Sequence, residues 1–199
     1  MDRTRTLRTA ASLALGAALG FSLAGSSAFA KEPELVRLRA FAVDLNTRAR
    51  TGTVDIVIER WSTPEETSNL KAVLLEKGDD ELLSALQKTK PRCGYVRSST
   101  SLSWDIYFAR ETELPSGGRR IVVASDRPVG IWEARNQGRS MDYQFSLAEI
   151  RLGSDGRGEG KAIPYAQLTF DKDENTLEIE NYQREPVRLN EVTVIEPEK

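Results

Sequence analysis

The chain has 199 residues, and its 28 Lys and Arg against 30 Asp and Glu give a net charge of −2 at neutral pH. This mixed, nearly neutral composition argues against nucleic acid or an anionic membrane surface as a partner, because both require a concentrated basic face. The sequence contains no histidine, which excludes Ser-His-Asp and Cys-His nucleophiles and imidazole-ligated zinc or copper sites. Any catalysis would therefore depend on Asp, Glu, Lys, Tyr or Ser side chains.

Residues 1–30 are typical of an export signal. The segment opens with arginines, continues with small apolar residues over 10–24, and ends in the small-x-small pattern that a signal peptidase cleaves at 28–30. The apolar run is too short and too rich in Ala and Gly for a membrane anchor. We therefore predict a signal peptide followed by a single exported β-rich domain over residues 31–199, periplasmic or extracellular, with no membrane span after cleavage.

Alternating apolar and polar residues predict two strands at the start of this domain, over residues 34–45 and 53–61. The apolar positions of the first strand change parity near Ala40, which indicates a β-bulge. A polar loop over residues 46–52 joins the two strands, so we expect them to pair as a hairpin.

The next segment carries the sequence signals of a helix. Thr63 is a typical N-cap, Pro64 suits the first helical position and Glu66 completes a capping box. Gly78 suits the end of this helix. A second short helix follows, with Asp79 or Asp80 as its cap, and Lys88, Lys90 and Pro91 end it.

Period-two alternation returns after Gly94 and continues to the end of the chain. The expected strands cover residues 102–108, 121–124, 141–147, 161–170, 176–182 and 187–194, with a glycine-rich turn or loop over residues 153–160. We predict a mainly β (α+β) fold: an antiparallel curled sheet or barrel of about eight to nine strands, with a two-helix insertion after the second strand.

Cys93 is the only cysteine, so no intramolecular disulfide can form. We expect it to be a small buried residue near the start of a strand, with an intermolecular disulfide as the alternative. The acidic segment 171–175 has oxygen ligands at alternating positions, as at the start of a calcium loop, but Thr176 and Tyr182 stand where that loop needs Gly and Glu. We therefore expect a plain hairpin turn there, no metal site and no cofactor.

Three short segments place an acid, an arginine and an aromatic residue or proline at the predicted ends of elements, where binding residues often lie. The candidate binding residues are Glu59, Arg60, Trp61, Asp126, Arg127, Trp132 and Glu133. Paired carboxylates in a cleft would suit a glycosidase, and the tryptophans would stack on a sugar or an aliphatic ligand. The alternative is structural: the arginines pair with the acids and the tryptophans pack over the helices.

Four aromatic side chains alternate along the predicted strands: Trp104, Tyr107, Tyr143 and Phe145. Such residues usually belong to the core. In a barrel they would instead line a pocket for an apolar ligand, because a barrel of about eight strands is wide enough for one small molecule.

Four stretches, at residues 58–63, 126–128, 158–161 and 178–182, resemble a family of small exported bacterial proteins with no assigned activity. The resemblance implies export and a shared fold, and it assigns no catalytic residues. We expect a soluble, non-catalytic domain that binds a small apolar or amphipathic ligand or a protein of the cell envelope. The alternatives are a carboxylate-dependent hydrolase acting on carbohydrate and an envelope interaction protein that pairs through a sheet edge. The oligomeric state stays open.

Overall fold

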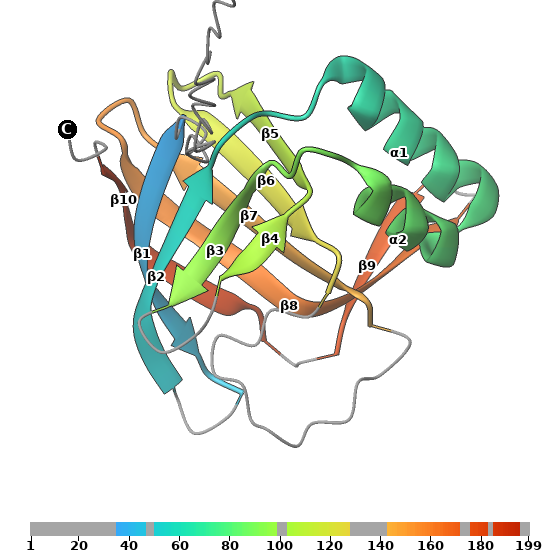
Figure 1. The fold of residues 1–199 in the computed structure, drawn as a ribbon. Helices are drawn as coiled ribbons and strands as arrows, with labels where there is room; N and C mark the ends of the chain where they lie inside the picture. Colours follow the sequence, from blue (N-terminus) through green and yellow to red (C-terminus); the bar gives the residue numbers. More distant parts are fainter. Residues whose placement is uncertain are drawn as a thin grey trace, which may run out of the picture. The chain divides into compact units, whose positions relative to one another are not determined.

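A computed structural model describes residues 35–46, 50–98, 103–127, 143–171, 176–182 and 185–195. These residues are mainly β, with two helices (Figure 1). The elements in chain order are β1 Val36–Asp44, β2 Arg50–Ile58, α1 Pro64–Lys77, α2 Asp79–Lys88, β3 Gly94–Ser98, β4 Trp104–Ile106, β5 Phe108–Glu113, β6 Arg119–Ser125, β7 Phe145–Leu152, β8 Arg157–Asp171, β9 Thr176–Asn181 and β10 Val187–Ile195.

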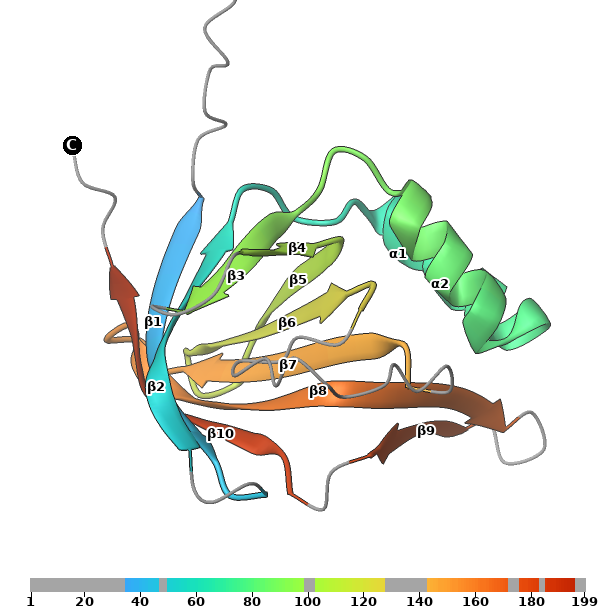
Figure 2. The same ribbon diagram turned by 60° about the horizontal axis from the view of Figure 1, so that its bottom comes forward.

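The strands form one antiparallel sheet that curls into a nearly closed barrel (Figures 1 and 2). Its order is β4-β3-β2-β1-β10-β8-β7-β6-β5, and β9 pairs with β8 outside this path. The first strand lies beside the last, since Leu38 pairs with Val194 on one side and with Ile56 on the other. The predicted fold class, a barrel-like antiparallel sheet with helices after the second strand, is confirmed.

A bend at Tyr107, between β4 and β5, brings the two ends of the sheet together. Before the bend, β4 pairs with β3, and the carbonyl oxygen of Ile106 accepts a hydrogen bond from the Cys93 N–H at 2.7 Å. After the bend, β5 pairs with β6, and the Tyr107 N–H donates to the carbonyl oxygen of Ala124 at 3.0 Å. The prediction of one uninterrupted strand is wrong here, because a change of pairing partner leaves no mark on the alternation of side chains.

Strands β1 and β2 form the predicted hairpin, with Asp44 opposite Arg50 beside the turn. The predicted bulge in β1 is wrong, because β1 pairs with β2 without interruption and keeps Ala40 and Ala42 buried while Phe41 is exposed. The register does shift between Arg39 and Phe41 in the pairing with β10, but the extra residue lies on β10. Strand β2 begins earlier than predicted, since its pairing with β1 continues through residues that read as a polar loop. Strand β3 was not predicted separately.

The helical pair begins at the predicted capping box. The Thr63 hydroxyl accepts a hydrogen bond from the Glu66 N–H at 3.1 Å, and the Glu66 carboxylate accepts one from the Thr63 N–H at 2.9 Å. Both helices pack on the second half of β8, which is longer than its neighbours and also carries β9 (Figure 2). Leu70 of α1 and Leu82 of α2 form an apolar cluster with Leu168 of β8.

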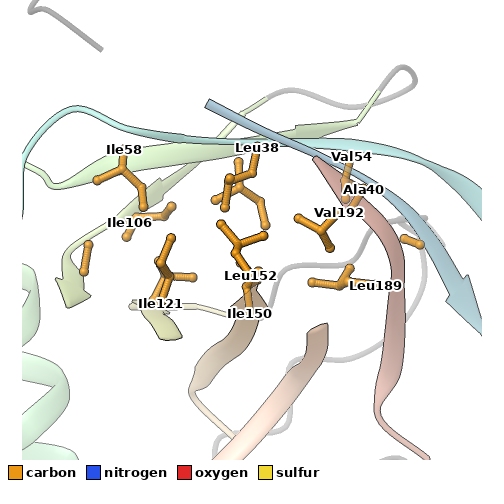
Figure 3. Close-up of a cluster of buried hydrophobic side chains, with 14 of the residues drawn as sticks. Leu38, Ala40, Val54, Ile58, Ile106, Ile121, Ile150, Leu152, Leu189 and Val192 are labelled. Carbon is orange, nitrogen blue, oxygen red and sulfur yellow. The ribbon is translucent and has the colours of Figure 1, made fainter. Parts of the chain in front are cut away.

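Aliphatic side chains from alternate strand positions fill most of the barrel (Figure 3). Leu38, Ile58, Ile121, Ile150 and Leu189 are each at most 1% exposed. Burial of one such side chain contributes about 1.5–3 kcal/mol. The barrel interior is therefore the main core of the fold.

Glycines of β8 allow this strand to approach β7 closely. A Cβ atom added to Gly158 would lie 1.8 Å from the carbonyl oxygen of Arg151, and one added to Gly160 would also meet backbone of β7. The sequence prediction of a turn or loop over residues 153–160 is wrong for residues 157–160, which belong to β8. A glycine that permits close strand contact has the same sequence signature as a glycine that makes a turn.

Cys93 is fully buried directly before β3, as predicted. Its thiol donates to the carbonyl oxygen of Tyr107 at 3.3 Å, and a side chain with no exposed surface cannot reach a second chain. The disulfide alternative is therefore inconsistent with the folded barrel. Trp104 and Phe145 are buried, whereas Tyr107 and Tyr143 are half-buried.

Candidate functional site

An apolar cavity of about 50 Å³ lies inside the barrel. Its walls come from strands on both sides of the barrel, including Val54 of β2, Ile106 of β4, Val123 of β6 and Leu189 of β10. None of the aromatic side chains that the sequence analysis considered as pocket-lining contributes to it. The interior is therefore an aliphatic core with one small unfilled region.

The cavity arises from small side chains in one row across the sheet. Val123, Ala148, Ala162 and Val187 lie directly opposite one another on β6, β7, β8 and β10. In the next row of the sheet, two residues further along β7, the residue that corresponds to Ala148 is the larger Ile150, which fills its part of the core. Because protein interiors are otherwise close-packed, two neighbouring alanines in such a layer leave volume unfilled.

Two serines supply the polar groups of the cavity wall. Ser125 and Ser146 lie opposite each other on β6 and β7, and they are only 4% and 8% exposed. The Ser146 hydroxyl contacts the carbonyl oxygens of Pro164 at 2.7 Å and of Arg127 at 2.9 Å. Within the described part of the chain, the Ser125 hydroxyl has no hydrogen-bond partner. A buried hydroxyl without a partner costs about 1–3 kcal/mol. The cavity surface itself is almost entirely apolar, so Ser125 would gain a partner only if its hydroxyl turned towards a ligand.

The structure places Glu59, the first of the predicted site residues, in a buried ion pair. Its carboxylate is 6% exposed and accepts hydrogen bonds from Arg92 at 2.9 and 3.2 Å. Arg92 also donates to Asp105 at 2.6 Å and lies over the ring of Tyr95. Both oxygens of Glu59 are engaged, which favours its structural interpretation over a role as a free catalytic carboxylate.

Arg60 and Trp61 also hold the fold together. Arg60 donates to both carboxylate oxygens of Glu66, at 2.8 and 3.1 Å, and so joins the end of β2 to the cap of α1. It donates as well to the carbonyl oxygen of Pro91 at 2.9 Å. Trp61 is half-buried and packs against the barrel core rather than over the helices.

The structure links the Glu59 segment to the Asp126 segment. Burial raises the pKa of the Tyr107 phenol, and the nearby charges of Asp126 and Asp105 raise this pKa further. The Tyr107 hydroxyl lies 3.5 Å from the Asp105 carboxylate, which is in turn bound by Arg92. A chain of polar contacts therefore runs from Glu59 through Arg92 and Asp105 to the Tyr107 hydroxyl, which lies near the charge of Asp126.

The backbone of Arg127 lies next to the cavity, because its carbonyl oxygen contacts the hydroxyl of Ser146, a residue that lines the cavity. Asp126 and Arg127 directly follow Ser125, which lines the cavity. Of the remaining predicted site residues, Trp132 and Glu133 lie outside the described residues. The structure thus places Asp126 and Arg127 beside the cavity and Glu59 and Arg60 in ion pairs.

Five residues of this region were not predicted from the sequence as site residues: Arg92, Ser125, Ser146, Ala148 and Ala162. Ser125 had a local signal, since it ends an apolar strand and precedes the predicted Asp126. The alanines had none, because an alanine creates a cavity only when the residue opposite it is also small.

Comparisons with protein-family models, curated proteins and solved structures each found no match. Within the described ranges, no helix is long and apolar enough to cross a membrane. In the same ranges, no three acidic or thiol side chains converge as they would around a metal ion.

Proposed function

We propose that this protein is an exported, non-catalytic binding protein whose barrel holds the end of a slender apolar or amphipathic molecule. The observation that carries the proposal is the aliphatic cavity, with Ser125 among its lining residues. Within the described residues, the Ser125 hydroxyl has no hydrogen-bond partner. Small-molecule sites typically combine apolar walls with a few polar groups that fix orientation. The surface of this cavity is almost entirely apolar, and Ser125 and Ser146 are the polar residues among those that line it.

The size of the cavity limits the ligand. At about 50 Å³ it is much smaller than the cavities of about 150 Å³ that bind benzene in other proteins. It therefore suits the tip of a straight alkyl chain and excludes a ring. A hydroxyl or carbonyl group next to that tip would hydrogen-bond to Ser125.

The proposal can be tested with 1-butanol and cyclohexanol as probes and NMR spectroscopy as the measurement. We expect 1-butanol to shift the methyl signals of Ala148 and Ala162, and cyclohexanol to leave them unchanged. Replacement of Ser125 by alanine should weaken 1-butanol binding by about 2- to 10-fold, since it removes one hydrogen bond. Binding of xenon, which needs no hydrogen bond, should be unaffected by this change.

Filling the cavity provides the matching variants. Ala148→Leu should abolish binding of both xenon and 1-butanol. If the leucine prevents folding, the smaller change Ala148→Val takes its place and should weaken binding of both probes. Ala72→Leu, the same change at an exposed position of α1, should have no effect. Binding that survives in Ala148→Val and Ala148→Leu would show that the probes bind elsewhere and would refute the proposal.

A second candidate function, an interaction with an envelope protein, is supported by strand β9. This strand pairs with β8 along one edge, and its apolar side chains Leu177 and Ile179 are 49% and 46% exposed. Glu178 and Glu180 alternate with them. The other edge of β9 is the one that would pair with a partner. Because apolar and acidic residues alternate along β9, the matching partner is an extended segment that alternates apolar and basic residues. A second copy of β9 fits less well, because antiparallel pairing would place glutamates opposite glutamates.

Charge reversal tests this second candidate. We expect a fluorescent peptide of alternating Lys and Val to bind the protein, and an alternating Glu and Val peptide not to bind. In the double variant Glu178→Lys/Glu180→Lys the preference should reverse, while Glu149→Lys on β7 should change nothing. If both peptides bound equally, or the reversal had no effect, the assignment of β9 would be wrong.

A further inference from the structure

A row of charged and hydroxyl side chains crosses the outer face of the barrel, on the side of the sheet that faces away from the cavity. Arg97 of β3 lies opposite Asp55 of β2, which lies opposite Arg39 of β1. The row continues through Thr193 of β10 to Arg157 of β8. Strands are about 4.8 Å apart, so Arg39 and Arg157 are separated by about 10 Å with only a threonine between them.

The row and the neighbouring Arg37 of β1 carry more positive than negative charge. Arg37, Arg39 and Arg97 all approach the single carboxylate of Asp55, at 3.8, 2.8 and 3.2 Å. Burial raises the pKa of Asp55, but hydrogen bonds from Arg39 and Arg97 outweigh it and hold this pKa below its ordinary value. One ionised carboxylate therefore balances only one of three guanidinium groups.

The same face contains a groove of about 600 Å³. Its polar lining comes from Arg39, Arg157, Thr53, Thr193 and Glu191, and the half-exposed ring of Phe41 lies beside them. Within the described part of the chain, the Arg157 guanidinium forms no ion pair, although the Glu191 carboxylate lines the same groove. A basic and an acidic side chain that share a groove without pairing leave both available to a ligand.

The backbone is irregular where the groove lies. Strand β10 shifts register against both of its neighbours, between Asn190 and Thr193 opposite β1 and between Leu189 and Val192 opposite β8. Both Leu189 and Val192 point into the core, so an extra residue must be accommodated between them. Glu191 does this with φ of +51°, a left-handed conformation that side chains other than glycine rarely adopt. Bulges and strained residues of this kind concentrate at binding sites.

We propose that this groove binds an anionic sugar, such as a phosphorylated or carboxylated monosaccharide unit. Arg39 and Arg157 would hold the anionic group from two sides, since guanidinium groups bind phosphate and carboxylate oxygens in pairs. The hydroxyls of Thr53 and Thr193 and the carboxylate of Glu191 would bind sugar hydroxyls. The ring of Phe41 would lie against the apolar face of the sugar. This site is independent of the cavity inside the barrel.

Isothermal titration calorimetry with glucose 6-phosphate, glucuronate, glucose and inorganic phosphate tests the proposal. We expect at least one of the two anionic sugars to bind more tightly than both glucose and inorganic phosphate. A preference between phosphate and carboxylate identifies which anion the site takes. Arg157→Gln should raise the Kd of the preferred sugar by about 10-fold or more, because it removes a charged hydrogen-bond donor.

Arg151→Gln is the matched control, since Arg151 is an exposed arginine on the adjacent strand β7 that pairs with Glu149. This variant should leave the Kd unchanged, whereas Thr193→Val should raise it through loss of one hydroxyl. Three results would overturn the proposal: glucose binding as tightly as the anionic sugars, inorganic phosphate binding as tightly as them, or equal weakening in Arg151→Gln and Arg157→Gln. Absence of binding at about 10 mM sugar would overturn it as well.

Discussion

Gly158→Ala should remove most of the stability of the barrel. The added Cβ would lie 1.8 Å from the carbonyl oxygen of Arg151 and 2.9 Å from the Cα atom of Leu152, so β7 and β8 would have to separate. Both neighbours are backbone atoms in the middle of the sheet and cannot move aside as a flexible side chain can. We expect a loss of about 4 kcal/mol or more in the free energy of unfolding, measured by urea denaturation.

Gly117→Ala is the control that distinguishes the cost of a close contact from the cost of an unfavourable backbone conformation. Gly117 has φ of +81°, and no atom lies within 4 Å of the position of an added Cβ. Alanine there should cost only the conformational penalty of about 1–2 kcal/mol. If Gly158→Ala lowered the free energy of unfolding no more than Gly117→Ala, the inference that β7 and β8 approach each other closely would be wrong.

Arg92→Leu is expected to have the next largest effect. It leaves the Glu59 carboxylate, 6% exposed, without the guanidinium that binds both of its oxygens. An unpaired charge in such a position costs about 3–5 kcal/mol, whereas the intact pair contributes much less. Thermal and urea unfolding of the variant should both show this loss.

Two further variants identify the cause. Arg92→Leu/Glu59→Gln removes the buried charge and should recover part of the lost stability. Arg151→Leu breaks the pair with Glu149, in which both side chains are well exposed, and should change stability by less than about 0.5 kcal/mol. Equal losses in Arg92→Leu and Arg151→Leu would contradict the structural importance assigned to the Glu59–Arg92 pair.

Features that depend on neighbours in the chain could be predicted from the sequence. The capping box of Thr63 and Glu66 closes within a few residues, so its residue types are sufficient to recognise it. The burial of Cys93 was predicted from its residue type and its place before a strand.

Features that depend on which strands lie side by side could not be predicted. The bend at Tyr107 changes the pairing partner from β3 to β6 without changing the alternation of side chains. Gly158 and Gly160 were assigned to a turn because the sequence does not reveal that β7 approaches them. For the same reason, the sequence suggested Glu59 as a binding residue, although Arg92 occupies its carboxylate.

The sequence by itself determined the class of this protein: a mainly β chain with one helical insertion and without the histidine on which many catalytic sites depend. Only the tertiary structure decided where binding could occur. The cavity requires Ala148 to lie opposite Ala162, and the outer groove requires Arg39, Thr193 and Arg157 to lie in one row. Both depend on the register between strands far apart in the chain, which is set by packing of the whole barrel rather than by any local pattern.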